Sequence, residues 1–385
     1  MNYLNILKNA SVLVFGLLLI YICGCQRVQD TIVSEPHDAM GAAPVSVSVV
    51  YPGDCLGDFA YCDVLYNGIQ KAKTELSVEI TEMESNFETW DMQLRAAAEH
   101  SGLVITSGYQ MRDPVLRVAP EFPEVMFVIF DAAVDLPNVV SFTHRVNEGT
   151  FLLGAIAGLK SKTGKVGYLG GANVPLLHEF EAGYLAGVKA VNPEAEIMRG
   201  YVADDQQGFY DPVKGQEIAT TQYESGVDVI YAMADQSGFG AIEAAKMAEG
   251  RYVIWNYIDI TDVAPGIVLT GLRVGIDASA YSVIQEFATG SLMAGVRSLG
   301  LAEDNVGYLL TEGNKGLLSD ALLEKVEALK ASIIVGEIAA PMVPETGIQG
   351  TVIPPTTSED DDEMVTEPNV EGTIVAPVGG APDTP

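Results

Sequence analysis

Short apolar runs alternate with amphipathic stretches of helical period along most of this chain. Such runs are typical of strands whose two faces are both covered by helices. Repeated strand and helix units of this kind build parallel sheets, so the sequence predicts an α/β fold. We expect strands at Val45–Tyr51, Val104–Thr106, Val125–Phe130, Val166–Leu169, Val227–Ala232 and Tyr252–Tyr257, and helices at Val64–Leu76, Trp90–Glu99, Gly149–Lys162, Leu177–Ala190, Lys214–Glu224, Gly240–Ala248 and Ala278–Ala288.

The units fall into two series. The composition changes near Arg145–Phe151 and a second series of the same kind follows, which predicts two Rossmann-like lobes rather than one sheet. We expect lobe 1 to span residues 45–144 plus 273–300 and lobe 2 to span 145–272 plus 301–340. Parallel sheets bind ligands at the carboxyl ends of their strands, so two facing lobes would enclose a cleft lined by strand-end loops.

Residues 1–25 have the pattern of an export signal. Lys8 precedes the run Ser11–Ile22, whose 12 residues are short for a membrane span but normal for a signal-peptide core. The run ends in Ile22-Cys23-Gly24-Cys25, which matches the bacterial lipobox and predicts lipidation of Cys25. A plain signal peptide or an uncleaved anchor helix is the alternative, since Cys23 is unusual two residues before a cleavage site. In each case the chain leaves the cytoplasm.

Polar segments without an apolar period flank the predicted lobes. Residues 26–44 suit a flexible tether, and residues 341–385, rich in Pro, Gly and acids, are predicted to be a disordered tail. The net charge is −31, and eight acids without a base lie within 358–385. This charge would repel a phosphate backbone, which excludes nucleic acid as a natural partner.

Two cysteines, Cys55 and Cys62, remain once the signal is removed and Cys25 is lipidated. This pair could form a disulfide in an exported chain, and two free thiols are equally compatible with the spacing. The four histidines are scattered and no CxxC or HxxxH pattern occurs, so we predict no metal site and no cofactor. The absence of GxSxG and P-loop motifs argues against an enzyme.

Seven segments occur in order between Val45 and Pro341: Phe127–Asp131, Leu136–Val139, Glu148–Gly158, Lys162–Gly171, Phe180–Gly187, Asp211–Gly215 and Ala264–Thr270. In this order they resemble the basic membrane protein (BMP) family of substrate-binding lipoproteins, whose best-understood members are PnrA-like purine-nucleoside receptors of ABC importers. The resemblance implies a type I periplasmic-binding-protein fold with a ligand cleft between two lobes. The small residues Gly149, Gly154, Ala157 and Gly158 are interpreted as close packing of a helix rather than as ligand contacts.

Two aromatic residues are the first candidates for the site. The resemblance places Tyr61 and Phe180 on either side of a planar base, where offset stacking would contribute about 1 kcal/mol each. Phe180 could instead anchor its helix in the core. Tyr61 departs from the family, which usually has phenylalanine between serine and asparagine, whereas this chain has Ala60 and Cys62.

Carboxylates at strand ends are the second group of candidates. Asp131 follows an apolar strand, and the resemblance makes it a hydrogen-bond acceptor for the ligand, with helix capping or a hinge contact as the alternative. Asp235 lies in a glycine-rich loop of the second lobe, and Tyr109 in the equivalent loop of the first. Asp58, close to Tyr61, is also included.

The expected ribose-binding positions differ from the family. Tyr257 stands where nucleoside-binding members commonly have aspartate, and Val274 where they have lysine. Asp259 and Arg273 lie nearby and could substitute after a register shift. The predicted ligand-binding set is therefore Asp58, Tyr61, Cys62, Tyr109, Asp131, Phe180, Asp235, Tyr257, Asp259 and Arg273.

These features predict a lipid-anchored receptor that faces the cell exterior or periplasm and binds a small molecule, with a purine nucleoside as the expected ligand and an ABC permease as the membrane partner. The alternatives are a ligand-sensing signalling lipoprotein and a binder of a non-nucleoside small molecule. A nucleoside hydrolase and a structural lipoprotein with a vestigial cleft are further alternatives.

Overall fold

The computed structural model describes residues 45–53, 55–343 and 351–353 of the chain. The predicted signal, Cys25 and the predicted tether at 26–44 lie outside the described residues, as does most of the predicted tail. Within the described part, no helix combines the length and the apolar composition that a membrane crossing requires.

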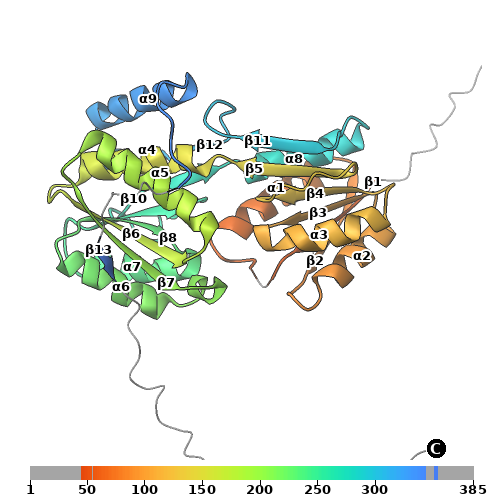
Figure 1. Cartoon of the computed structure of the whole chain (residues 1–385), viewed down its shortest axis with the longest axis horizontal. Coiled ribbons are helices and arrows are strands. Elements are labelled where there is room, and N and C mark those ends of the chain that lie inside the picture. The colour runs from red at the N-terminus through yellow and green to blue at the C-terminus, as the bar shows by residue number, and fades with distance from the viewer. Residues whose placement is uncertain (1–44, 54, 344–350, 354–385) are drawn as a thin grey trace, which may run out of the picture. The chain divides into compact units, whose positions relative to one another are not determined.

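The first sheet has six strands in the order β11-β5-β4-β3-β1-β2, and all neighbours run parallel (Figure 1). Helices α1 and α8 pack on one face and α2 and α3 on the other. The elements are β1 (Val45–Tyr51), α1 (Tyr61–Glu75), β2 (Val78–Glu84), α2 (Trp90–His100), β3 (Leu103–Ser107), α3 (Arg112–Val118), β4 (Met126–Phe130), β5 (Val139–His144), α8 (Ile276–Ala288) and β11 (Gly295–Leu299).

The second sheet has seven strands in the order β12-β10-β9-β8-β6-β7-β13. Helices α4 and α5 pack on one face, α6 and α7 on the other, and α9 packs against α4. The elements are α4 (Val146–Lys160), β6 (Lys165–Ala172), α5 (Pro175–Val191), β7 (Glu196–Ala203), α6 (Pro212–Glu224), β8 (Val229–Met233), α7 (Asp235–Lys246), β9 (Tyr252–Asn256), β10 (Val268–Val274), β12 (Val306–Tyr308), α9 (Asp320–Ile334) and β13 (Thr351–Ile353).

Two parallel sheets with helices on both faces confirm the predicted two-lobed α/β fold. Two features of the second sheet depart from the expected parallel arrangement and from the expected disordered tail. Strand β12 runs antiparallel to β10. Strand β13 comes from the segment predicted to be a disordered tail, and it pairs in parallel with β7 at the edge of the second sheet.

The chain passes between the two sheets after β5, after β10 and between β11 and β12. The connecting segments are hydrogen-bonded to one another. The Arg145 N–H donates to the Leu299 carbonyl (2.8 Å), and the Gly275 N–H donates to the Asn305 carbonyl (2.7 Å). Backbone hydrogen bonds thus hold the connecting segments side by side.

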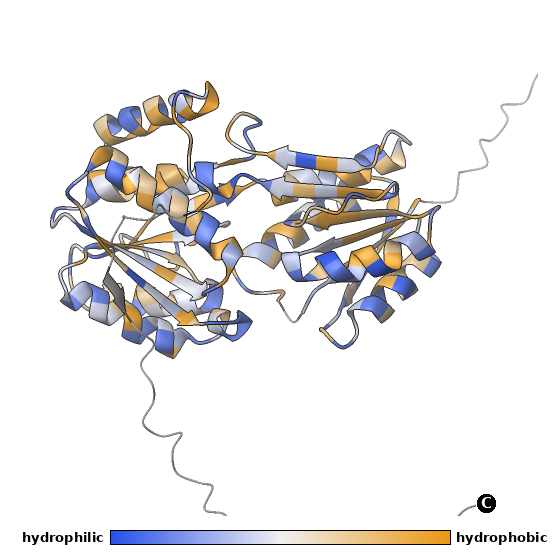
Figure 2. Ribbon diagram, in the orientation of Figure 1, coloured by the Kyte–Doolittle hydropathy of each residue, from blue (hydrophilic) through white to orange (hydrophobic). Residues whose placement is uncertain are grey.

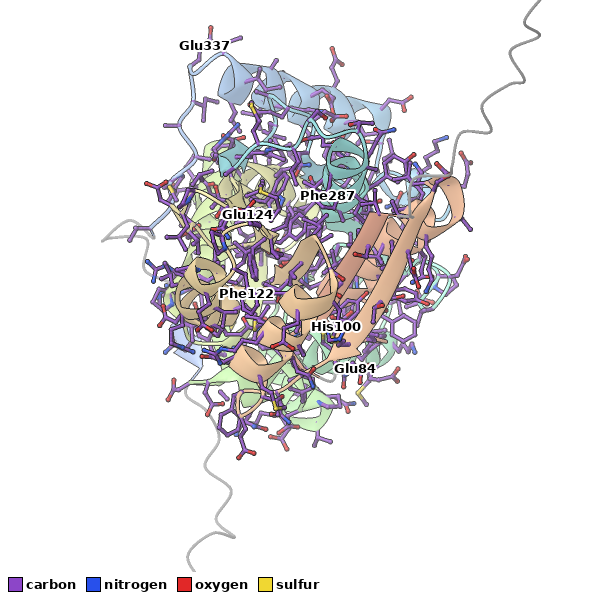
Figure 3. All side chains as sticks on the ribbon, turned by 90° about the vertical axis from the view of Figure 1, so that its right-hand side faces the viewer. Glu84, His100, Phe122, Glu124, Phe287 and Glu337 are labelled. Atoms are coloured by element: carbon purple, nitrogen blue, oxygen red, sulfur yellow. A yellow bond between two sulfur atoms is a disulfide. The ribbon has the colours of Figure 1, made fainter. Side chains whose placement is uncertain are left out.

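The distribution of hydropathy explains this layering. Strands β3 and β4 are mostly hydrophobic, whereas α2 and α3 combine both residue classes (Figure 2). The buried sides of α2 and α3 face the sheet. Glu84, Glu124 and Glu337 are exposed, as acidic side chains on a solvated surface should be (Figure 3).

Helices α4 and α5 pack unusually closely, because glycines stand at their contact. A methyl group at Gly154 would overlap the carbonyl oxygen of Tyr184, and one at Gly187 would overlap that of Phe151. The small residues on α4 therefore serve helix packing, as the sequence indicated.

Candidate functional site

A cavity of about 450 Å³ lies between the lobes, at the ends of strands of both sheets. This is the edge at which parallel α/β sheets bind ligands. Eight of the ten predicted ligand-binding residues line it: Asp58, Tyr61, Cys62, Tyr109, Asp131, Phe180, Asp235 and Tyr257.

Backbone strain is concentrated around this cavity. Among the described residues, five non-glycine residues have positive φ, and three of them, Asp131 (59°), Asp235 (43°) and Tyr257 (61°), line the cavity. Each such conformation costs about 1–3 kcal/mol and persists only where the surrounding structure enforces it. Clustering of this kind is typical of ligand sites.

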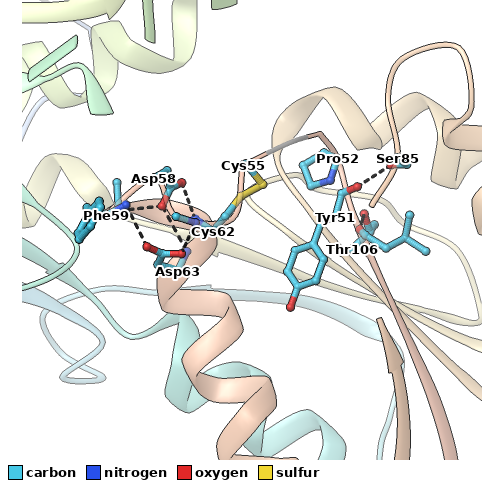
Figure 4. The surroundings of a disulfide bond; sticks show 12 residues. Tyr51, Pro52, Cys55, Asp58, Phe59, Cys62, Asp63, Ser85 and Thr106 are labelled. Atoms are coloured by element: carbon cyan, nitrogen blue, oxygen red, sulfur yellow. Dashed lines mark hydrogen bonds between the residues drawn. A yellow bond between two sulfur atoms is a disulfide. The ribbon is translucent and has the colours of Figure 1, made fainter. Parts of the chain in front are cut away.

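The loop before α1 forms one wall and is closed by a disulfide between Cys55 and Cys62 (Figure 4). The buried Asp58 carboxylate accepts hydrogen bonds from the N–H groups of Ala60 (2.8 Å) and Cys62 (2.9 Å). Burial raises the pKa of Asp58 to about 6, although these N–H groups oppose the shift. A crosslink of this span contributes about 2 kcal/mol by restricting the unfolded chain. The segment from Cys55 to Cys62, which includes Tyr61, is therefore held in a defined shape.

Asp131 and His144 are hydrogen-bonded to each other at the ends of β4 and β5. The Asp131 Oδ1 lies 2.6 Å from His144 Nδ1, and the imidazole ring is fully buried. Tyr61 lies beside them. Burial of the Tyr61 hydroxyl is the main cause that raises its pKa, and the nearby Asp131 carboxylate raises it further. Its ring meets that of Tyr257 edge to face, with centroids 5.7 Å apart. Aromatic and acidic groups from both lobes thus face the same space.

Asp235 is the first residue of α7 and follows β8 directly. Its Oδ1 is enclosed and has no hydrogen-bond partner among the described residues. Burial raises the pKa of Asp235 to about 8, and the negative charge of Asp58 adds to the shift. An unpaired acceptor at this position costs folding free energy that a ligand could recover.

The two lobes also contact each other directly, both at the cavity and outside its lining. Gln206 Nε2 donates to the Tyr109 hydroxyl (3.0 Å), and Trp255 Nε1 donates to the Phe59 carbonyl (3.1 Å). The Phe59 ring meets Phe239 edge to face. These contacts hold the lobes together around the cavity.

Asp259 and Arg273 are not brought to the cavity. Arg273 lies on β10 and pairs with Asp304 (2.7 Å), and Asp259 accepts a hydrogen bond from the Thr261 N–H (2.9 Å). Each charge is compensated locally, so the register shift considered from the sequence does not occur. The positive-φ turn at Tyr257 directs the chain away before Asp259 is reached.

Sequence reasoning missed several lining residues, including His144, Glu179, Gln206 and Met233. His144 ends β5, a strand that the sequence did not predict. The signal for it was its position one residue before the composition change at Arg145. Within the described ranges, no group of three or more His, Cys, Asp or Glu side chains is arranged to hold a metal ion.

Comparison with known proteins agrees with this geometry. The family model described as PnrA-like ABC transporter substrate-binding protein matches residues 44–343. The chain is 32% identical to basic membrane protein A2 of Borrelia garinii subsp. bavariensis, covering 77% of this chain and 88% of the relative. It is 34% identical to the CD4+ T-cell-stimulating antigen of Listeria monocytogenes, covering 63% and 71% respectively.

A similar structure is that of an ABC transporter solute-binding protein from Aeropyrum pernix. Its TM-score is 0.69 at 26% identity, and the match covers 77% of this chain and 94% of that one.

Proposed function

The chain belongs to the PnrA-like family of ABC transporter substrate-binding proteins, and from this premise we propose that it captures a purine nucleoside between its lobes for import. The observation that carries the proposal is the combination of Tyr61, Phe180 and Asp131 around one cavity. The aromatic rings would hold a flat base, and the carboxylate would accept its N–H groups. The family consists of solute-binding proteins, so no reaction is assigned to the cavity.

Closure of the lobes around the ligand would produce the state that docks on the permease. The contacts from Gln206 to Tyr109 and from Trp255 to Phe59 join the lobes, and they would be lost if the cleft opened. A ligand that touches both lobes favours this closed arrangement, because it binds the open one less well.

A ligand panel tests the nucleoside assignment. We expect a purine nucleoside at 100 times its Kd to raise the Tm by roughly 5 °C, since it stabilises the folded state by about 2.7 kcal/mol. Its 5′-monophosphate should give a much smaller shift, because the phosphate would enter a cavity lined by four carboxylates. The Tm is measured by thermal denaturation in the presence of nucleosides, free bases and sugars. Stabilisation by another class alone would overturn the assignment.

A non-nucleoside planar molecule is the second candidate. It is favoured by the position of Asp259 and Arg273, which do not reach the cavity and so cannot bind a ribose there. The panel above separates the two candidates directly.

We also propose that Cys25 carries the lipid anchor that keeps the receptor at the membrane. A Cys25→Ala variant is expected to move from the membrane fraction to the soluble fraction of the expressing cells and to lose the mass of the diacylglyceryl group. Fractionation and mass spectrometry of the mature N-terminus check this. An unchanged membrane association and mass would contradict lipidation at this residue.

A further inference from the structure

The cavity contains more carboxylates than cations. Its acidic lining residues are Asp58, Asp131, Glu179 and Asp235. The basic side chains among its lining residues belong to His144 and Arg145. His144 is paired with Asp131, and Arg145 is paired with Glu148 (2.7 Å) and Glu303 (2.6 Å), neither of which lines the cavity. The protein therefore supplies no spare cation to this space from its described residues.

The acidic groups differ in how well they are compensated. Asp58 accepts backbone N–H groups of its own loop, and Asp131 has His144. Asp235 has an enclosed Oδ1 without a partner among the residues described. The backbone of Asp235 has a positive φ of 43°. Glu179 is only partly buried, and no atom of it is among the enclosed atoms without a partner. Of the four carboxylates, Asp235 therefore most needs a donor from outside the protein.

Aromatic rings surround the acidic groups. Tyr257 is only 8% exposed, lines the cavity, and meets Tyr61 edge to face. The faces of such rings attract positive charge, and their flat surfaces favour planar ligands. A carboxylate among aromatic rings is suited to a planar molecule that carries a nitrogen donor.

We infer that Asp235 accepts a hydrogen bond from an amino or amidinium nitrogen of a planar ligand, and that the cleft selects for such a group. The inference rests on the proposed function of this cleft as the ligand site. When the Asp235 carboxylate is ionised, a ligand carbonyl or carboxylate at the same position would place an acceptor against an acceptor. The nitrogen donor of the ligand is thus the missing partner of Asp235.

Matched compound pairs test this selection by calorimetric titration of the full chain purified in detergent, at pH 9, where Asp235 with its pKa of about 8 is mostly ionised. Adenosine and purine riboside differ by the 6-amino group, and guanosine and inosine differ by the 2-amino group. Benzamidine and benzamide differ by charge on the same planar ring and contain no sugar. In one of the two nucleoside pairs, we expect the member with the exocyclic amino group to bind about tenfold more tightly or better. We expect the same preference for benzamidine over benzamide.

The Asp235→Asn variant should reduce these preferences to about threefold or less, because it removes the charge and keeps a residue that tolerates positive φ. The exposed Asp262→Asn variant is the matched control and should keep them. Equal binding within the pairs in the natural protein, or preferences that survive Asp235→Asn, would overturn the inference.

Different results would contradict the nucleoside assignment and the role of Asp235. If no nucleoside binds, the nucleoside assignment fails while the benzamidine pair still reports on Asp235. If nucleosides bind without regard to their amino groups, the assignment stands and the role of Asp235 is wrong. If none of the six compounds binds at millimolar concentration, both are overturned.

Discussion

Replacing Phe180 with alanine is expected to weaken ligand binding by at least tenfold. Phe180 lies on α5, is 3% exposed and lines the cavity. The substitution removes a stacking contribution of about 1 kcal/mol and a burial contribution of about 1.5–3 kcal/mol. The substitution also removes part of this burial contribution from the unliganded protein, and that part does not affect affinity. The loss of binding free energy is therefore expected near the lower end of the sum of the two contributions. Isothermal titration of purified protein with the stabilising nucleoside measures it.

Phe151→Ala is the matched control for this experiment. Phe151 is also 3% exposed and belongs to the same hydrophobic core, but it lies on α4 and is not among the residues that line the cavity. Both substitutions should lower the free energy of unfolding by about 3–5 kcal/mol. Only Phe180→Ala should also lower affinity. An unchanged Kd in Phe180→Ala would assign this ring to the core alone.

The second large effect is expected at the contact of α4 and α5. Gly187→Ala should reduce the free energy of unfolding by about 3 kcal/mol, because the new methyl group overlaps the backbone of Phe151 and the helices must separate. Helix propensity alone predicts the opposite sign, a gain of about 1 kcal/mol. Chemical denaturation monitored by circular dichroism determines which effect dominates.

Gly316→Ala provides the control for Gly187→Ala. Nothing lies within 4 Å of the position that its methyl group would occupy, and its φ is not positive. Its stability should therefore change by less than about 1 kcal/mol. A Gly187→Ala variant as stable as the natural protein would show that the two helices can move apart at little cost.

Several strands whose faces are both buried were predicted from the sequence, although β5 and β10, which are also buried on both faces, were not. β1 has the bounds expected for it, and β3, β4, β6, β8 and β9 lie where apolar runs indicated strands. β2 was missed because it alternates polar and apolar residues at the sheet edge, as in Val78-Glu-Ile-Thr-Glu-Met-Glu84. β7 was missed for the same reason, since its burial also alternates along much of the strand. A search for continuous apolar runs cannot find strands with one exposed face.

The candidate site was predicted unevenly. Residues that directly follow an apolar strand, such as Asp131, were found because the carboxyl end of a parallel strand is a position fixed by local sequence. His144 was missed because β5 was missed. Arg273 does not line the cavity, because it forms an ion pair with Asp304, which comes 31 residues later in the turn before β12.

The sequence by itself determined the α/β class, the division into two lobes and the family, because periodicity and motif order are local properties of the chain. Only the tertiary structure decided which carboxylates are compensated. Asp58 is compensated by its own loop and Asp131 by His144, whereas Asp235 has an oxygen without a partner. The free energy of a buried charge depends on neighbours that are distant in sequence. The acidic residues can therefore be identified from the sequence, but only the folded structure shows which of them has an oxygen without a hydrogen-bond partner.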